Sequence, residues 1–246
     1  MKLKKSNIIL ICLAVVYFAN IAVNYVIMQN IVSVKGNGNL ETSEITVSAF
    51  EKINCVEKAE VRFYASEKYR VVVTIDENLR EYIEILTTDS VLNIKTKNQQ
   101  KTVLPTKFTV DVYCPVLTGV TMSGTGSFTA IDKIIASTFK SIITGSGKIE
   151  ATIECDNYFA MITGSGNINV YGNSNDAYIS IIGSGDLNGN DLNTKNANTN
   201  ITGSGDINIS VLDNLIAKIT GSGNIRYSGE PKVDSNVSGS GVIRKM

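Results

Sequence analysis

The sequence predicts an all-β protein whose second half is a parallel β-solenoid. Three observations support this prediction. Seven Gly-x-Gly triplets recur between Gly124 and Gly241, their intervals are nearly constant at 18 to 21 residues, and apolar residues hold fixed positions around each triplet. A period of this length is the signature of a repeat architecture in which each unit forms one coil. Six triplets are Gly-Ser-Gly, and the first is Gly124-Thr125-Gly126.

Each repeat unit reads as strand, glycine corner, strand. Two residues before each triplet the chain is always apolar, at Met122, Ile143, Ile162, Ile181, Ile201, Ile219 and Val237. Four residues after the first glycine it is apolar again, at Phe128, Ile149, Ile168, Leu187, Ile207, Ile225 and Ile243. The neighbours of this second set are mostly polar, as on a strand with one buried face. Stacked coils would bury one continuous core that a single unit cannot form.

The triplet glycines are the candidate structural residues of the repeat. A sharp turn between two coil faces often needs a positive φ, and closely stacked coils leave little room for a Cβ. The predicted corner residues are Gly124, Gly126, Gly145, Gly147, Gly164, Gly166, Gly183, Gly185, Gly203, Gly205, Gly221, Gly223, Gly239 and Gly241. Alanine at any of them is expected to impair folding first.

The N-terminus predicts a membrane anchor. After a basic flank at residues 1–6, residues 7–28 contain no charged side chain and would span about 33 Å as a helix. The flanking lysines favour an N-terminus in the cytoplasm with the remainder outside. A cleaved signal peptide is the alternative, because the densest apolar run, Ile8–Ala19, is short; no good small-x-small cleavage site follows it. Residues 29–35 then read as a linker.

Residues 36–115 predict a β-rich N-terminal lobe that begins or caps the solenoid of residues 116–246. Runs such as Tyr69–Ile75 and Lys107–Tyr113 are rich in β-branched and aromatic residues. An open solenoid end exposes strand edges and needs a cover.

Three local features are expected within the lobe. Asp76–Tyr82 predicts a short helical turn, and Asp89-Ser90 predicts a hairpin. Gly36-Asn37-Gly38 looks like an isolated early copy of the glycine corner.

Catalytic chemistry is largely excluded by composition. Histidine is absent, which removes the commonest general base and the commonest transition-metal ligand, and no Cys-x-x-Cys occurs. The carboxylate pairs Glu57/Glu60 and Asp186/Asp191 are what any polar β surface provides. We therefore predict no enzyme and no cofactor. Carbohydrate hydrolysis by such a pair is the one catalytic alternative.

Glycine-rich ligand sites are weighed against plain turns. Gly145-Ser146-Gly147-Lys148 lacks the strand-turn-helix context of a phosphate loop. The segment 183–191 is somewhat like a calcium-binding nonapeptide, but the pattern does not recur every nine residues, which favours ordinary turn chemistry. No metal site is predicted.

Charge and cysteine content set further bounds. All 23 acidic residues and 20 of the 23 basic ones follow Met28, so the exported part has a formal charge of −3 and no basic run. That balance predicts no nucleic-acid partner. Cys55, Cys114 and Cys155 lie in the exported part, and their odd number favours buried thiols over a disulfide framework, with one disulfide plus a free thiol left open.

Aromatic and amide side chains have two interpretations. Eight tyrosines are candidates for stacking on sugars or for packing on strand faces, and packing is favoured. They are Tyr64, Tyr69, Tyr82, Tyr113, Tyr158, Tyr171, Tyr178 and Tyr227. The asparagines of the repeats are explained by stacked amide ladders and turns without a ligand.

The serial Gly-Ser-Gly-Asn/Asp-Ile units, together with Gly36-x-Gly38 and Ala49-Phe50-Glu51-Lys52-Ile53, resemble the putative auto-transporter adhesin head GIN domain family. The likeness extends over roughly residues 34–244. It implies a bacterial envelope protein with a β-solenoid fold, no established catalytic activity and no set of binding residues.

These observations predict a bacterial single-pass membrane protein whose periplasmic or extracellular β-solenoid is a non-catalytic binding or adhesion module. Its expected partners are the membrane, through residues 7–28, and a glycan or envelope protein on a flat coil face. A self-associating envelope scaffold, a homo-oligomer joined through strand edges, is the alternative.

Overall fold

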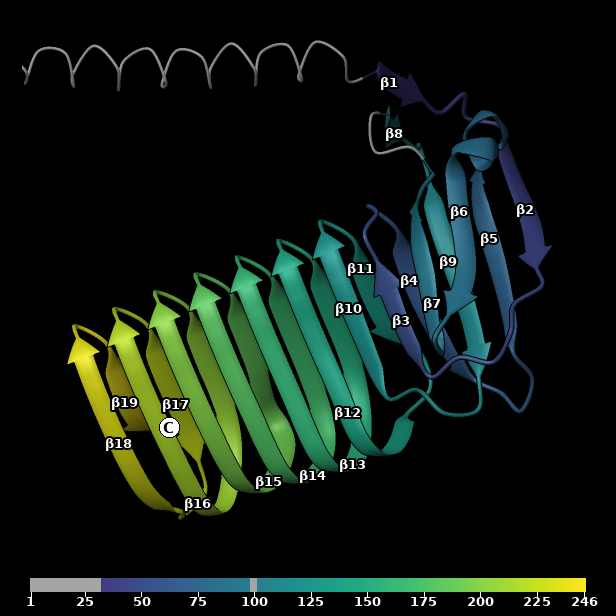
Figure 1. Cartoon of the computed structure of the whole chain (residues 1–246). Coiled ribbons are helices and arrows are strands. Elements are labelled where there is room, and N and C mark those ends of the chain that lie inside the picture. Colours follow the sequence, from purple (N-terminus) through teal and green to yellow (C-terminus); the bar gives the residue numbers. More distant parts are fainter. Residues whose placement is uncertain (1–31, 98–100) are drawn as a thin grey trace, which may run out of the picture.

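The computed structural model describes residues 32–97 and 101–246, and within them it confirms an all-β fold with a β-solenoid in the second half of the chain (Figure 1). The long coil strands are β12 (Ile134–Gly145), β13 (Lys148–Gly164), β14 (Asn167–Gly183), β15 (Asp186–Gly203) and β16 (Asp206–Gly221). Shorter coil strands flank them at β10 (Gly119–Gly124), β11 (Ser127–Ala130), β17 (Asn224–Ser228), β18 (Lys232–Gly239) and β19 (Val242–Lys245).

Every coil pairs in parallel with the next, and the repeat sets the register. The first triplet glycines are aligned from Gly124 through Gly145 to Gly239. Each long strand bends in the middle, so one coil contributes to two sheet faces. The strand segments that lead into the glycine corner form the front face, and the segments that follow the corner form the back face (Figure 1).

The core lies between these two faces. In β13, Ile149 and Ile153 point inward from the back, and Tyr158 and Ile162 point inward from the front; all four are fully buried. The residues two before and four after the first glycine are buried in the coils from Met122 to Ile225. The alternation in the sequence therefore corresponds to one continuous hydrophobic core.

The two glycines of a triplet have different roles. The first has a positive φ in all seven corners, for example 117° at Gly145, where a Cβ would lie 2.7 Å from the carbonyl oxygen of Gly124. The second has no positive φ, but it packs tightly: a Cβ on Gly166 would lie 2.8 Å from the carbonyl oxygen of Gly147. Between them, a serine N–H donates to the coil before, as Ser165 does to the Gly145 carbonyl at 2.9 Å.

The lobe is continuous with the solenoid sheet. On the front, β10 pairs in parallel with β3 (Lys52–Cys55), which pairs with β7 (Val91–Thr96); β6 (Ile83–Thr88) is antiparallel to β7. On the back, β11 pairs with β4 (Glu60–Ala65), which pairs with β9 (Phe108–Cys114). The antiparallel β5 (Arg70–Asp76) and β2 (Leu40–Ile45) complete this side.

β3 and β4 therefore form one more coil, on the lobe side of the first glycine corner at Gly124. Their connection runs from Val56 to Ala59 and contains no glycine, and a Cβ on Gly126 would lie 2.5 Å from the Glu57 carbonyl oxygen. The buried Phe50 packs edge to face against Tyr69 in the lobe core, with ring centroids 5.4 Å apart.

The early glycine copy is not a coil corner, which corrects that expectation. Gly38 has a φ of 84°, but the β2 strand that follows runs antiparallel to β5 instead of stacking on a coil. Gly36 is instead pressed against the Asp76 carboxylate, where a Cβ would collide. Residues 36–38 therefore have the sequence of a glycine corner, but they do not connect two strands of a coil.

Two local predictions are confirmed. A 3₁₀ helix, η1, covers Glu77–Tyr82, and Asp89 and Ser90 both have positive φ in the hairpin between β6 and β7.

The predicted membrane segment 7–28 lies outside the described residues. No helix in residues 32–97 or 101–246 is long and apolar enough to cross a membrane. Within the predicted linker 29–35, residues Val32–Lys35 form β1, which pairs in parallel with β8 (Lys101–Leu104).

The three cysteines that the structure describes are free thiols. Cys55 and Cys114 are buried, and burial raises the pKa of each to about 12. Cys155 is only half-buried; burial is also the main cause of its raised pKa. The expectation of buried thiols thus holds for the first two and only partly for Cys155.

Candidate functional site

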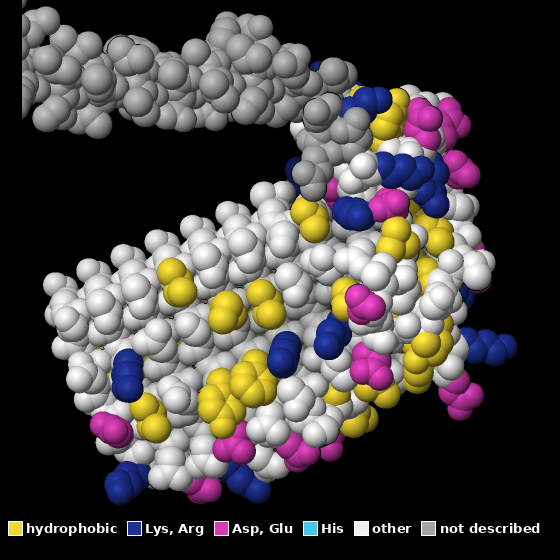
Figure 2. All heavy atoms as spheres, viewed as in Figure 1, with side chains coloured by type: hydrophobic (Ala, Val, Ile, Leu, Met, Phe, Trp, Pro, Cys, Tyr) yellow, Lys and Arg dark blue, Asp and Glu magenta, His cyan; other side chains and the backbone are white. Residues whose placement is uncertain are grey.

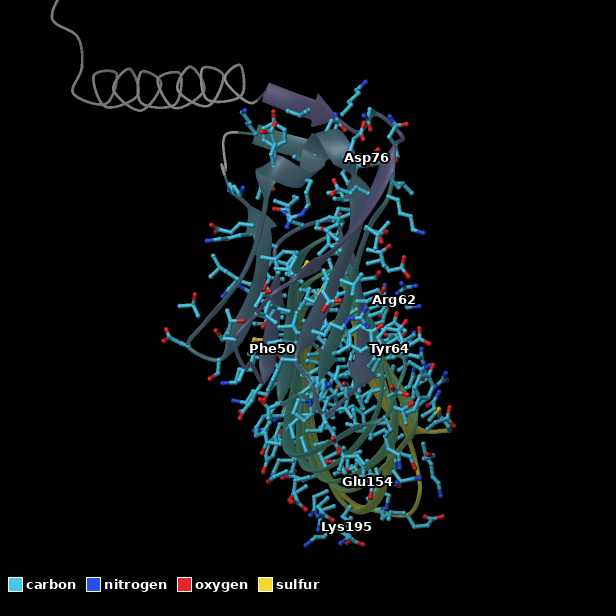
Figure 3. The ribbon with its side chains drawn as sticks, turned by 90° about the vertical axis from the view of Figure 1, so that its right-hand side faces the viewer. Phe50, Arg62, Tyr64, Asp76, Glu154 and Lys195 are labelled. Atoms are coloured by element: carbon cyan, nitrogen blue, oxygen red, sulfur yellow. The ribbon has the colours of Figure 1, made fainter. Side chains whose placement is uncertain are left out.

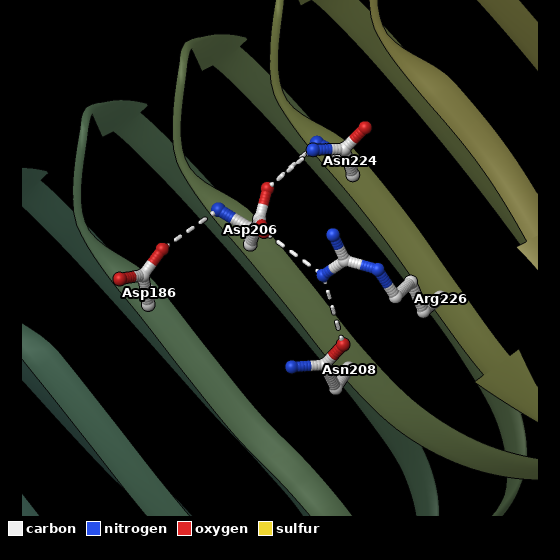
Figure 4. A network of polar contacts seen from close by, with 5 residues as sticks. All are labelled: Asp186, Asp206, Asn208, Asn224 and Arg226. Carbon is white, nitrogen blue, oxygen red and sulfur yellow. Dashed lines mark hydrogen bonds and ion pairs between the residues drawn. The ribbon is translucent and has the colours of Figure 1, made fainter. Parts of the chain in front are cut away.

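The back face of the solenoid is covered by polar side chains that bond to one another. Asp206 accepts hydrogen bonds from the backbone and side-chain nitrogens of Asn224, at 3.0 and 2.8 Å, and pairs with Arg226 at 2.9 Å (Figure 4). Burial opposes ionisation of Asp206, but these contacts outweigh it and lower its pKa. The Asp206 N–H in turn donates to Asp186 at 3.0 Å. Each of these side chains therefore has a partner on a neighbouring coil.

The front face differs because apolar side chains gather on it over β12 to β16 (Figure 2). Its centre is the repeat position five residues before each triplet. There the register aligns Lys140, Phe159, Tyr178, Asn198 and Ile216 on successive coils. The exposed fractions of Phe159 and Tyr178 are 36% and 43%, so both aromatic side chains reach the solvent. Isolated apolar side chains are normal on a surface, but a contiguous group marks a candidate binding site.

The rings of Phe159 and Tyr178 stack on each other. Their centroids are 4.9 Å apart and their planes differ by 11°. The Lys140 ammonium lies 5.5 Å from the centroid of the Phe159 ring. One face of the Tyr178 ring is therefore covered by Phe159, and the other is directed toward the next coil, β15.

Beside the aromatic pair lies a groove of about 390 Å³ between two rows of front-face side chains. Ile142 and Met161 line one side of it, and Phe159 and Tyr178 line the other, with Asn198 and Asn200 at one end. A smaller hollow of about 150 Å³ borders Tyr178 toward the coil bend.

The smaller hollow is lined by an amide ladder. The Asn196 amide donates to the Asp176 carboxylate at 2.9 Å, and the Asn214 amide donates to the Asn196 oxygen at 2.8 Å. This is the stacked amide arrangement expected for the asparagine-rich repeats. Asn198 and Asn200 lie outside the ladder, and their side chains form no hydrogen bond within the part of the chain that the structure describes.

A larger polar hollow of about 570 Å³ lies at the bend of the coils. Glu154 and Lys195 line it at the end of the molecule away from Asp76 (Figure 3). Glu154 pairs with Lys133 at 2.8 Å, and that hydrogen bond lowers its pKa. The hollow is open and its charged groups are solvated, which does not favour catalysis.

One member of each acidic pair weighed as a hydrolase candidate has a structural partner. Glu57 accepts two hydrogen bonds of 2.6 Å from the backbone and hydroxyl of Thr96 and so fixes the end of β7. Asp186 is engaged with the Asp206 backbone as described above. Among residues 32–97 and 101–246, no three Cys, Asp or Glu side chains form a group that would hold a metal ion.

The other candidate tyrosines mostly pack. Tyr158 is fully buried, and Tyr64 stacks on Tyr113 at 4.8 Å on the outer surface of the lobe. Arg62, which is labelled with Tyr64 in Figure 3, forms a bidentate pair with Asp111 at 2.6 and 2.7 Å. These contacts join β4 to β9.

A family model for the putative auto-transporter adhesin, head GIN domain, matches residues 49–231, about three quarters of the chain. The chain belongs to this family. The family is named for adhesion and not for an enzyme activity. None of the curated proteins matches the sequence significantly.

Solved structures resemble this head GIN domain over nearly its whole described length. A putative adhesin from Parabacteroides merdae is 30% identical, covers 87% of this chain and 99% of its own, and has a TM-score of 0.72. A protein from Parabacteroides distasonis, named as a putative lipid binding protein, is 29% identical with coverages of 87% and 99% and a TM-score of 0.74.

A putative adhesin from Bacteroides fragilis shares the fold at a TM-score of 0.81 and 20% identity, with 87% of this chain and 100% of that chain covered. In each of these crystal structures the matched part makes up 99% or more of the chain.

The sequence pointed to part of the front-face site of this head GIN domain. Tyr178 was among the eight candidate tyrosines, whereas Phe159 was not singled out. Both hold the same repeat position, five residues before a triplet glycine. Comparing the outward positions of successive repeats is the signal that finds the pair.

Proposed function

We propose that this head GIN domain is a non-catalytic binding module of the bacterial envelope that holds its partner on the front face of the solenoid. The exposed stack of Phe159 and Tyr178 carries the proposal, because it stands beside an apolar groove on an otherwise polar repeat. Residues 7–28 would anchor the module in the membrane and place the solenoid in the periplasm or outside the cell.

Adhesion is the form of binding that the family name suggests. The relative named as a putative lipid binding protein suggests a lipid partner as an alternative occupant of the same groove. Both alternatives use the front face, so a first experiment need not separate them.

The test is retention of purified residues 32–246 on immobilised bacterial envelope material. Replacing Phe159 with Ser and Met161 with Thr together removes two exposed apolar side chains that line the groove without touching the core. We expect retention to fall at least about tenfold. A matched back-face variant, Tyr171→Ser, should retain the wild-type level. Equal retention of the two variants would place the contact elsewhere.

A self-associating scaffold is the second candidate. All eight residues of β18 are exposed, and within the described residues this strand pairs only with β16. Such an edge can pair with another chain. Size-exclusion chromatography with light scattering separates the two functions: concentration-dependent oligomers without envelope retention support the scaffold, and a monomer that is retained supports the binding module.

A further inference from the structure

We infer that the front face binds a neutral saccharide, with one sugar ring inserted between Tyr178 and Ile216 above Asn198. This inference rests on the proposed function and names the ligand class of the same face.

The repeat register builds a slot of the required width. Tyr178, Asn198 and Ile216 are aligned on three successive coils and line the smaller hollow described above, which we call the slot. Since neighbouring strands lie about 4.8 Å apart, the two larger side chains stand about 9.6 Å from each other, with the shorter Asn198 between them. A sugar ring held midway would be close to van der Waals contact with both walls. Both walls are accessible, because Tyr178 and Ile216 are exposed.

The Tyr178 ring supplies a preorganised stacking surface. Phe159 covers only one of its faces, and Lys140 supports Phe159 from the other side. The free face of Tyr178 is directed at the slot. A side chain that is already held in its binding conformation loses less conformational entropy when the ligand arrives.

The floor of the slot distinguishes a saccharide from an acyl chain. Asn198 on the floor, and Asn200 beside it in the adjoining groove, offer amide donors and acceptors whose hydrogen bonds are not formed within the described residues, and sugar hydroxyls match both. An acyl chain laid over these amides would remove them from water without replacing their hydrogen bonds, which costs free energy. A lipid is therefore disfavoured at this position.

Charge argues for a neutral ligand. Among the side chains that line the smaller hollow, only Asp176 is ionisable, and it is paired with Asn196. Lys140 lies three coils from Asn198, beyond the aromatic pair. Lys218 is aligned with Asn200 on the next coil, but no Lys or Arg is among the described residues that line the smaller hollow, so binding there should depend little on salt, because screening acts on charged pairs.

The experiment is a nuclear magnetic resonance titration of ¹⁵N-labelled residues 32–246. The probes are the tetrasaccharides of β-1,4-linked glucose, α-1,4-linked glucose and β-1,4-linked N-acetylglucosamine. With at least one of them we expect saturable shifts of the Asn198 and Asn200 side-chain amides. Tyr178→Ala should weaken that binding at least about tenfold, and Tyr178→Phe should keep it within about threefold.

Two further variants guard against an effect on folding. Asn198→Leu fills the slot without removing a wall and should abolish binding, while Tyr171→Ala on the back face should leave it unchanged. The inference is overturned if no probe shifts these amides at about 10 mM, or if Tyr178→Ala binds like the wild type.

Phosphatidylcholine vesicles provide the lipid arm. Vesicle binding without saccharide binding would also overturn the inference and assign the groove to lipid. The proposed function fails separately: it falls only if envelope retention does not depend on Phe159 and Met161. Retention that is lost in that double variant, with no saccharide bound, would keep the binding module and reject its sugar ligand.

Discussion

The phenol ring of Tyr178 stacks on the phenyl ring of Phe159 with centroids 4.9 Å apart, although the two residues lie 19 positions apart in the sequence. They meet because the repeat that separates them is 19 residues long and every coil is paired in register with the next. The interaction is therefore a direct product of the repeat length.

A double-mutant cycle measures this stack. We expect Phe159→Ala and Tyr178→Ala to be coupled by about 0.5–1.5 kcal/mol in the free energy of unfolding, the range for aromatic pairs. Urea unfolding of the four proteins gives the coupling. A value near zero would mean that the rings are not held together in solution.

The glycine corners are predicted to tolerate no side chain. In Gly164→Ala, a Cβ would be placed at a φ of 123° and against the Gly145 carbonyl, so we expect a loss of about 3 kcal/mol or more. Gly189→Ala is the control, because Gly189 has no positive φ and its nearest neighbour to a Cβ is 3.3 Å away. That variant should change stability by less than about 1 kcal/mol. Equal effects in thermal or urea unfolding would refute the corner assignment.

Asp76 is predicted to stabilise the lobe through hydrogen bonds to its ionised carboxylate. Asp76 is fully buried, and its carboxylate accepts hydrogen bonds from the Gly38 N–H and from the backbone N–H and hydroxyl of Thr106, each at 2.8 Å. Burial alone would raise its pKa, but these bonds outweigh it and lower the pKa. Asp76→Asn replaces one of these acceptor oxygens with an amide nitrogen, so that a donor faces a donor, and should cost at least about 2 kcal/mol at pH 7.

The pH dependence of that cost has a defined sign. Because the folded pKa of Asp76 is depressed, its contribution is complete above the unfolded pKa of about 4 and is lost as the pH falls through the folded pKa. The stability difference between wild type and Asp76→Asn should therefore shrink below about pH 4. Urea unfolding at pH 7 and pH 3 tests this, and a stability difference that stays constant would contradict an ionised Asp76 carboxylate in the folded protein.

Thiol reactivity should follow burial. At pH 8 we expect a thiol-specific disulfide reagent to modify Cys155 first, because Cys155 is only half-buried. Cys55 and Cys114 have pKa values raised to about 12 by burial and should react only after unfolding. Timed labelling of residues 32–246 with mass spectrometry reports the order; fast modification of Cys55 in the folded protein would argue against its placement in the core.

The solenoid was predictable because each of its requirements leaves a local mark. A positive φ and a tight approach require glycine, and one buried face requires alternation. The coil made by β3 and β4 has no glycine at its corner, residues 56–59, because no glycine corner of an earlier coil packs against it. The sequence pattern therefore does not reveal this coil. Gly36-x-Gly38 shows the converse, since it has the residues of a corner but faces Asp76 in an antiparallel part of the sheet.

The candidate site was only partly predictable for a similar reason. Tyr178 could be named as an exposed aromatic candidate, but its stacking partner depends on which residues of neighbouring coils are aligned. That alignment is visible once the repeats are placed in register by their glycines. The bend at the base of each coil varies in length, as the register shift between Gly189 and Asn193 shows, and no sequence pattern fixed it.

The most direct test of a front-face binding module is photocrosslinking in the full-length chain in living bacteria. A photoreactive phenylalanine analogue replaces Phe159 on the front in one protein and Tyr171 on the back in another. We predict light-dependent adducts from position 159 and none from position 171. Adducts from position 171 alone, or from neither position, would contradict the account.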